Sequence, residues 1–272
     1  VKSLEISKKF EKKYKNRFKF ENIKFSEINR IKTNKNILKG IIFDLGYATA
    51  QIKDPEKGLS FLSKGKLNMR MGLNEFSANE IVNDFDQSSL SKIFYSFGDE
   101  KKANNIARKI ISFRKSKNIE TQDLVKIIDS VYRKKFKKIH NSTKVFQALR
   151  IFVNKEISEL IDSLISSFKL LPKGGVIVVV SFHSIEDKIV KYFFHHYSQN
   201  KNSSRYLPEK ETKKILFNLP QKKPLIPEKY EILKNPPSRS AKLRYAIKIN
   251  ENQDFSDFKK KFKYLLDIEN IC

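Results

Sequence analysis

Two segments of the chain place polar side chains directly after apolar runs, which is where many α/β proteins carry their chemistry. The run GIIF ends in Asp44, and the run VIVVV ends just before Ser181 and His183. Such patterns predict buried parallel strands, covered on both faces, with polar side chains at their carboxyl ends. Because ligands bind at that edge of such sheets, Asp44, Ser181 and His183 are the candidate catalytic residues.

Two other chemistries fit these residue types less well. The segment SFHSIED contains the serine, histidine and aspartate of a hydrolase triad, but one short turn cannot stack them in order, and no G-x-S-x-G elbow is present. The four histidines, His140, His183, His195 and His196, lack a ligand spacing with carboxylates, so we expect no metal. The single cysteine is the last residue, which excludes an internal disulfide and a cysteine zinc site.

The segment between the two apolar runs is typical of helices. Ser77 and Glu80 form a capping box, and apolar residues recur at helical spacing from Ala103 to Ile110. These signals predict a helical insert over residues 76–142. A continuous apolar stripe then predicts one long core helix over residues 143–169, stopped by a proline and a glycine.

The remaining segments give weaker signals. RFKFENIKF alternates loosely and predicts a strand, while AKLRYAIKI predicts a half-exposed edge strand. Six of the eight prolines lie between Pro208 and Pro237, which indicates a loop. The last twenty residues predict one amphipathic helix. The expected organisation is a first sheet part (1–75), the helical insert (76–142), a second sheet part (143–250) and a C-terminal helix (251–272).

The charge of the chain favours a polyanionic partner. Lys and Arg number 56 against 30 Asp and Glu, a net charge of +26, and clusters such as FKKKFKY mix cations with rings. Cations neutralise phosphates and rings stack on bases, so nucleic acid is the expected partner. An AT-rich genome would also enrich lysine, and that explanation has nearly equal weight. No apolar run reaches the roughly 18 residues of a membrane span, and no signal peptide is visible, so we expect a soluble intracellular protein.

Five motifs occur in an order that resembles a known family: FDLG, LNMRM, FQALRIFVN, SFHSIED and NPPSRSAKLR. The chain resembles, from Arg17 to Ile249, the RsmH (MraW) family of S-adenosylmethionine-dependent methyltransferases. These enzymes modify the N4 amino group of a cytosine in bacterial small-subunit rRNA. The resemblance implies an α/β fold, the class I (Rossmann-like) methyltransferase sheet, with an inserted helical domain.

The resemblance also implies a cofactor pocket, S-adenosylmethionine being the cofactor, that is only partly present. Phe25 matches the family's aromatic residue at the adenine, Asp44 the acid beneath the cofactor, and Gln51 the glutamine that follows. The family's glycine-rich loop has no counterpart, because the first glycine is Gly40 and no two glycines stand one residue apart. We therefore expect that the chain lacks the first strands of the sheet. Either the sequence is a truncated form of the enzyme, or the protein is a non-catalytic RNA-binding remnant.

The expected reaction sets the roles of the remaining candidates. The lone pair of a cytosine amino group is delocalised, so acceptors such as Asp44, Ser181 and His183 must draw its hydrogens toward them while positioning supplies most of the rate. Lys144, Arg150 and Arg239 are the candidate RNA-binding residues, with salt links as an equally weighted alternative for the two arginines. The expected partner is small-subunit rRNA or an assembling small subunit. The expected compartment is the bacterial cytoplasm, with the mitochondrion as the alternative; a homodimer is left open.

Overall fold

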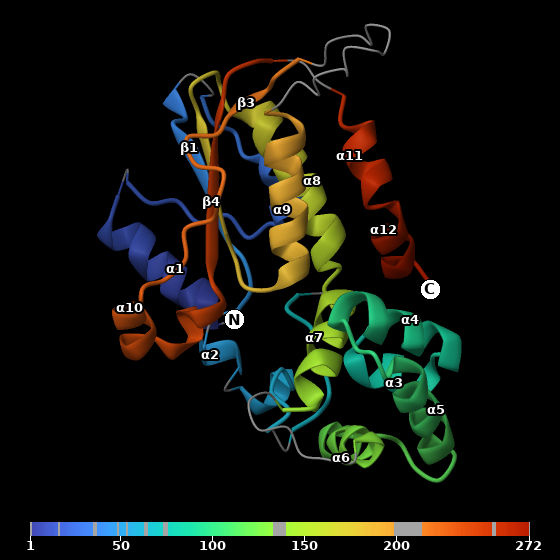
Figure 1. Cartoon of the computed structure of the whole chain (residues 1–272). Helices are drawn as coiled ribbons and strands as arrows, with labels where there is room; N and C mark the ends of the chain where they lie inside the picture. The colour runs from blue at the N-terminus through green and yellow to red at the C-terminus, as the bar shows by residue number, and fades with distance from the viewer. Residues whose placement is uncertain are drawn as a thin grey trace, which may run out of the picture.

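A computed structural model describes residues 2–15, 17–34, 37–47, 49–52, 54–62, 65–72, 76–132, 140–198, 214–251 and 254–271. Its centre is a four-stranded sheet in the order β1-β2-β4-β3, with a group of helices beyond one end of the sheet (Figure 1). The strands are β1 (Gly40–Asp44), β2 (Val176–Ser181), β3 (Phe217–Asn218) and β4 (Lys242–Lys248). Among the described residues, no helix combines the length and apolar character that crossing a bilayer requires.

The two strands predicted from apolar runs are confirmed. β1 and β2 pair in parallel, with Asp44 opposite Val180. The prediction that both faces are covered is wrong for β1, because Ile42 is 73% exposed while its neighbours Ile41 and Phe43 are buried. α8 (Glu156–Leu170) and α9 (Ser184–His196) lie against one face of the sheet, which we call the covered face (Figure 1). The opposite face, to which Ile42 points, is called the open face.

The predicted edge strand AKLRYAIKI is an interior strand. β4 lies between β2 and β3 and pairs antiparallel with both. Its alternation is also inverted relative to expectation, since Leu243, Tyr245 and Ile247 are half-buried whereas Arg244 and Lys248 are buried. The buried cations have partners: the Lys248 ammonium donates to the carbonyls of Phe168 and Leu171 and to the Glu251 carboxylate. Paired charges therefore occupy positions that an apolar pattern would assign to solvent.

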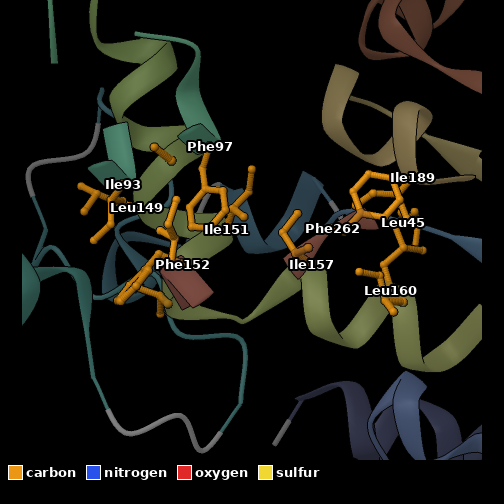
Figure 2. Close-up of a cluster of buried hydrophobic side chains, with 14 of the residues drawn as sticks. Leu45, Ile93, Phe97, Leu149, Ile151, Phe152, Ile157, Leu160, Ile189 and Phe262 are labelled. Carbon is orange, nitrogen blue, oxygen red and sulfur yellow. The ribbon is translucent and has the colours of Figure 1, made fainter. Parts of the chain in front are cut away.

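The described part of the segment predicted to be helical, residues 76–132, contains the four helices α3 (Ala78–Asp84), α4 (Gln87–Gly98), α5 (Ala103–Arg114) and α6 (Thr121–Val131). The predicted capping box is present, with Ser77 and Glu80 exchanging hydrogen bonds at the start of α3. α4 packs against α5 and against α7 (Ser142–Val153). Figure 2 shows Ile93, Phe97, Leu149 and Phe152 of this contact, and Leu45, Leu160 and Ile189 of the sheet layer, in one apolar core.

The predicted long core helix is two helices. α7 ends at Val153 and α8 begins at Glu156, with Lys155 in the left-handed region at a φ of 48°. The Asn154 side chain accepts a hydrogen bond from the Met71 amide at 2.8 Å and donates one to the Met69 carbonyl at 2.9 Å. These long-range bonds, made to the LNMRM segment, compete with helix continuation at that point.

The ends of the chain also differ from the predictions. Residues 17–25 form no strand; the segment follows α1 (Lys2–Lys13) and leads into the 3-10 helix η1 (Phe25–Arg30). Its backbone amides bond to side chains in place of a neighbouring strand: the Phe20 amide donates to the Glu11 carboxylate and the Ser26 amide to the Glu159 carboxylate. The predicted C-terminal helix is two short helices, α11 (Ser256–Lys261) and α12 (Lys263–Glu269). Of the proline-rich stretch from Pro208 to Pro237, residues 208–213 lie outside the described part. The rest of the stretch contains β3, α10 (Lys229–Lys234) and the start of η4 (Pro236–Ser240).

Candidate active site

The carboxyl ends of β1 and β2 meet at one edge of the sheet, as their sequences predicted. The Leu45 amide donates to the Val180 carbonyl at 3.1 Å, which carries the pairing past the end of β1. Gly46 lies beside the β2–α9 turn, where an added Cβ would be in ordinary van der Waals contact with the Phe182 ring at 3.6 Å. The FDLG and SFHS segments therefore lie next to each other.

The side chains of Asp44 and Ser181 point to opposite faces of this edge. Asp44 is exposed on the open face, because successive residues of a strand alternate and Phe43 is buried. Ser181 follows Val179 onto the covered face, is 2% exposed, and donates its hydroxyl to the Lys242 carbonyl at 3.3 Å. The structure thus brings these two candidates together through their backbones, and their reactive atoms face different layers.

His183 is the N-cap of α9, and its ring is buried. Its Nδ1 accepts the Glu186 amide at 3.4 Å, while Nε2 lies 3.0 Å from Glu186 Oε1 and 3.9 Å from Glu156 Oε2. Nε2 is buried close to both carboxylates but makes no hydrogen bond with either of them. Burial alone would lower the pKa of His183, but Glu156 and Glu186 raise it above its ordinary value.

Arg150 completes this group with a forked ion pair. Its Nε and Nη2 atoms each donate to one oxygen of Glu156 at 2.8 Å, and only 11% of its side chain is exposed. The ring of Tyr47 stacks on the guanidinium at 4.8 Å. Burial on its own would raise the pKa of Glu156, but the charge of Arg150 and the nearby His183 hold it below its usual range. We call Arg150, Glu156, His183 and Glu186 the strand-end cluster.

The strand-end cluster has the residue types of a metal site but the bonding of an ion-pair network. Glu156, His183 and Glu186 each offer a ligand atom within 4.8 Å of the others. The prediction that the histidines lack a ligand spacing with carboxylates is therefore wrong for His183. Both Glu156 oxygens, however, bind the Arg150 guanidinium. A hydrolase triad is equally absent from this turn, because Asp187 binds Arg244 at 2.7 Å and Lys242 at 3.0 Å instead of His183.

Sequence reasoning missed two members of this cluster, Glu156 and Glu186. The signal for Glu186 was the His183-x-x-Glu186 spacing, which forms a capping box at the start of α9. Glu156 gave no usable signal, because residues six apart in one continuous helix do not face each other. Only the break at Asn154 and Lys155 turns Glu156 back toward Arg150.

The predicted cofactor residues lie around the end of β1. The Phe25 ring is 49% exposed and makes an edge contact with Phe43, with 5.8 Å between the ring centroids. Gln51 lies in α2 (Thr49–Ile52), half-buried and with an interaction partner. Phe25 therefore contacts the side of β1 that carries Phe43, whereas the Asp44 side chain points to the open face.

The predicted RNA-binding residues occupy three different environments. Arg150 is buried in the strand-end cluster. Arg239 is exposed in η4, where it donates to the Pro236 carbonyl at 3.5 Å. Lys144 is half-buried, donates to the Asp99 carbonyl at 2.6 Å, and lines a pocket of about 590 Å³ that His183 also lines.

Comparison with known proteins identifies relatives over most of the chain. The model of the MraW methylase family matches residues 1–249. A ribosomal RNA small subunit methyltransferase H from Orientia tsutsugamushi (strain Ikeda) is 40% identical over 259 residues, which cover 91% of this chain and 82% of the relative. The protein of the same name from Chelativorans sp. (strain BNC1) is 40% identical over 245 residues, covering 89% and 71%. That from Sinorhizobium fredii (strain NBRC 101917 / NGR234) is 44% identical over 214 residues, covering 78% and 62%.

Proposed function

The chain belongs to the MraW methylase family, and from that membership we propose that it transfers a methyl group from S-adenosylmethionine to the N4 amino group of a cytosine in small-subunit rRNA. The relatives, which are named ribosomal RNA small subunit methyltransferases, support an rRNA substrate. Their bacterial sources favour the bacterial cytoplasm as the compartment. The observation that carries the proposal is the meeting of the FDLG and SFHS segments at one edge of a class I methyltransferase sheet.

Asp44 is the residue to which we assign contact with the reacting amino group. It is exposed at the carboxyl end of β1, and within the described residues no cation pairs with it. An ionised carboxylate there accepts a hydrogen bond from the amino group and favours the pyramidal nitrogen that attacks the methyl carbon. When bound, S-adenosylmethionine supplies a methyl group on a positively charged sulfur. Phe25 and Gln51 are the residues that we assign to its adenine and polar parts.

Ser181 and His183 take positioning roles in this proposal. The Ser181 hydroxyl donates to β4, and the His183 ring caps α9, so both fix the β2–α9 turn relative to these two elements. Arg150 acts in the same way, because its guanidinium is held by Glu156. Arg239 is exposed and Lys144 is half-buried, and these are the predicted residues left to contact RNA phosphates.

A methyl-transfer assay on assembled small subunits tests the proposal. The wild-type chain is expected to incorporate labelled methyl groups, and digestion of the rRNA should release N4-methylcytidine. Asp44→Asn should lower the rate by roughly 100-fold or more, because the neutral amide loses the charge that stabilises the reacting nitrogen. Asp84→Asn, an exposed aspartate in α3, is the matched control and should keep the wild-type rate.

The second candidate, a non-catalytic RNA-binding protein, is favoured by one feature of the sequence. The net charge of +26 favours binding of a polyanion, which needs no cofactor. Wild-type protein that binds the rRNA but neither binds S-adenosylmethionine in calorimetry nor transfers methyl groups would establish this alternative and reject the enzyme.

A further inference from the structure

A pocket next to the strand-end cluster has one wall that lies beyond the family match. Its other walls are the end of α4 (residues 95–99), the start of α7 with Lys144, and the β2–α9 turn (residues 182–185) with Lys188. The remaining wall consists of Lys261, Phe262, Tyr264 and Leu265, at the junction of α11 and α12, whereas the MraW model ends at residue 249. The C-terminal helices therefore add a surface to the molecule at a place adjoining the candidate active site.

This C-terminal wall is fixed in place by buried contacts. The Glu269 carboxylate, 2% exposed, accepts the amides of Ile157 at 2.7 Å and Ser158 at 2.9 Å, at the start of α8. Phe262 is 4% exposed in the core that Figure 2 shows. Tyr264 shares a hydrogen bond of 3.2 Å with Ser96 across the pocket, which joins α12 to α4. A wall anchored at three points presents its exposed side chains in a defined arrangement.

The pocket lining combines cations without acidic partners and exposed rings. Within the described part of the chain, no carboxylate pairs with Lys188 or Lys261, and both are exposed. Asp99 is the acid in the lining, and it lies 3.7 Å from Lys144. Tyr95 and Tyr264 are 60% and 61% exposed. Rings that accept a stacked base, beside ammonium groups that accept a phosphate, are the chemistry that binds unpaired nucleotides.

We propose that this pocket binds an unpaired nucleotide of the RNA substrate, as a subsite separate from Asp44. The base stacks on Tyr264 and Tyr95, and the ammonium groups of Lys188 and Lys261 bind the flanking phosphates. The volume of about 590 Å³ lies in the usual range for ligand pockets, about 300 to 1,000 Å³. The inference rests on the proposed function for the identity of RNA as substrate. The β2–α9 turn lines this pocket and also adjoins the sheet edge that carries Asp44. In this proposal the bound nucleotide and the reacting cytosine therefore belong to the same RNA.

Equilibrium binding of a fluorescein-labelled single-stranded RNA to the full chain, measured by anisotropy without cofactor, tests the subsite. The double variant Lys188→Ala, Lys261→Ala is expected to bind about tenfold more weakly at low salt. Its salt dependence should fall by about 1.4 in slope, or about 0.7 for each lost phosphate contact. The control is Lys259→Ala, Lys263→Ala, which removes the same charge from positions in α11 and α12 that do not line the pocket, where the lysines pair with Asp162 and Asp267.

Variants of Tyr264 test the stacking part of the proposal. Tyr264→Leu removes the ring and should weaken binding about tenfold, whereas Tyr264→Phe keeps the ring and should bind like wild type. Equal affinity of the two double lysine variants, or equal affinity of the leucine and phenylalanine variants, would overturn the subsite. Neither result would affect methyl transfer at Asp44, which the assay on small subunits measures separately. A wild-type chain that binds no RNA would overturn the subsite and the proposed function together.

Discussion

The strand-end cluster and the neighbouring pocket both hold charged side chains, but they hold them in opposite ways. In the cluster, Arg150, Glu156, His183 and Glu186 are largely buried and face one another. In the pocket, Lys188 and Lys261 are exposed, and no described carboxylate pairs with them. The two regions share the β2–α9 turn, so they differ in solvation and pairing over a short distance.

Desolvation explains why the charges are paired in the buried cluster and unpaired in the exposed pocket. A charge taken out of water needs a partner in good geometry, and that partner then occupies the donors a ligand would use. An exposed lysine keeps its hydration until a phosphate arrives, and contributes little to stability before that. The contrast predicts that substitutions in the cluster change folding, whereas substitutions of the pocket lysines change binding.

The largest expected effect on stability comes from removing the cation of the buried ion pair. Arg150→Met leaves the Glu156 carboxylate buried without its forked partner, and should lower the free energy of unfolding by about 3–5 kcal/mol. Urea denaturation followed by circular dichroism measures the loss. Glu156→Leu in the Arg150→Met background removes the orphaned charge and should recover much of it. A loss below about 1 kcal/mol for the single variant would mean that the cluster is not a stabilising network.

A pH-dependent effect links the two regions through Glu269, which joins the C-terminal wall of the pocket to the start of α8. Burial raises the pKa of Glu269 to about 7, with the nearby Glu156 adding to the shift. A carboxyl with a raised pKa stabilises the fold fully below its unfolded value, and this contribution is lost as the pH rises through about 7.

Glu269→Gln should therefore remove part of the pH dependence of unfolding between about pH 4.5 and pH 7. Relative to this variant, the wild-type chain should gain at most about 3 kcal/mol on acidification across that window. Denaturation curves at a series of pH values measure the difference, with the exposed Glu228→Gln as the control. Parallel pH profiles for wild type and Glu269→Gln would show that the carboxyl titrates normally.

A smaller loss of stability is expected from substituting Gly98, which lies where α4 meets α7 and lines the pocket. A Cβ on Gly98 would lie 2.5 Å from the Lys144 carbonyl oxygen, which is backbone and cannot easily move away. Gly98→Ala should therefore cost about 1–3 kcal/mol of unfolding free energy in thermal denaturation. Gly72→Ala is the matched control, because a Cβ there meets nothing within 4 Å. Equal stability of the two variants would mean that α4 and α7 separate without cost.

The sequence was sufficient where local pattern and packing agree. Each apolar run ending in polar residues predicted a strand, and the pairing of Asp44 with Val180 confirms that the two strand ends share an edge. The Ser77 capping box predicted the start of α3 correctly. These elements follow from hydrogen bonding and burial within a few residues, so they can be read without knowledge of the rest of the fold.

The sequence was insufficient where distant segments decide the outcome. The break before α8 depends on bonds from Asn154 to Met69 and Met71, and without it Glu156 does not reach Arg150. Arg150 appeared to be an RNA contact for that reason, although its guanidinium is bound by Glu156. Which face of β4 is buried also depends on distant residues, because Arg244 pairs with Asp187 of α9 and Lys248 donates to the Phe168 carbonyl of α8. Long-range polar pairing, which has no periodic signature, accounts for each of these differences.

The smallest expected effect on the free energy of unfolding comes from substituting an exposed lysine. Lys263 pairs with Asp267 one turn along α12, and the side chains are 69% and 58% exposed. Solvent screens such a pair, so Lys263→Ala should change the free energy of unfolding by less than about 0.5 kcal/mol in urea denaturation. Lys261→Ala, two residues away and without a carboxylate partner among the described residues, should be similarly neutral. If instead Lys261→Ala destabilised the fold as Arg150→Met does, the division between a buried cluster that stabilises and exposed lysines that bind would fail.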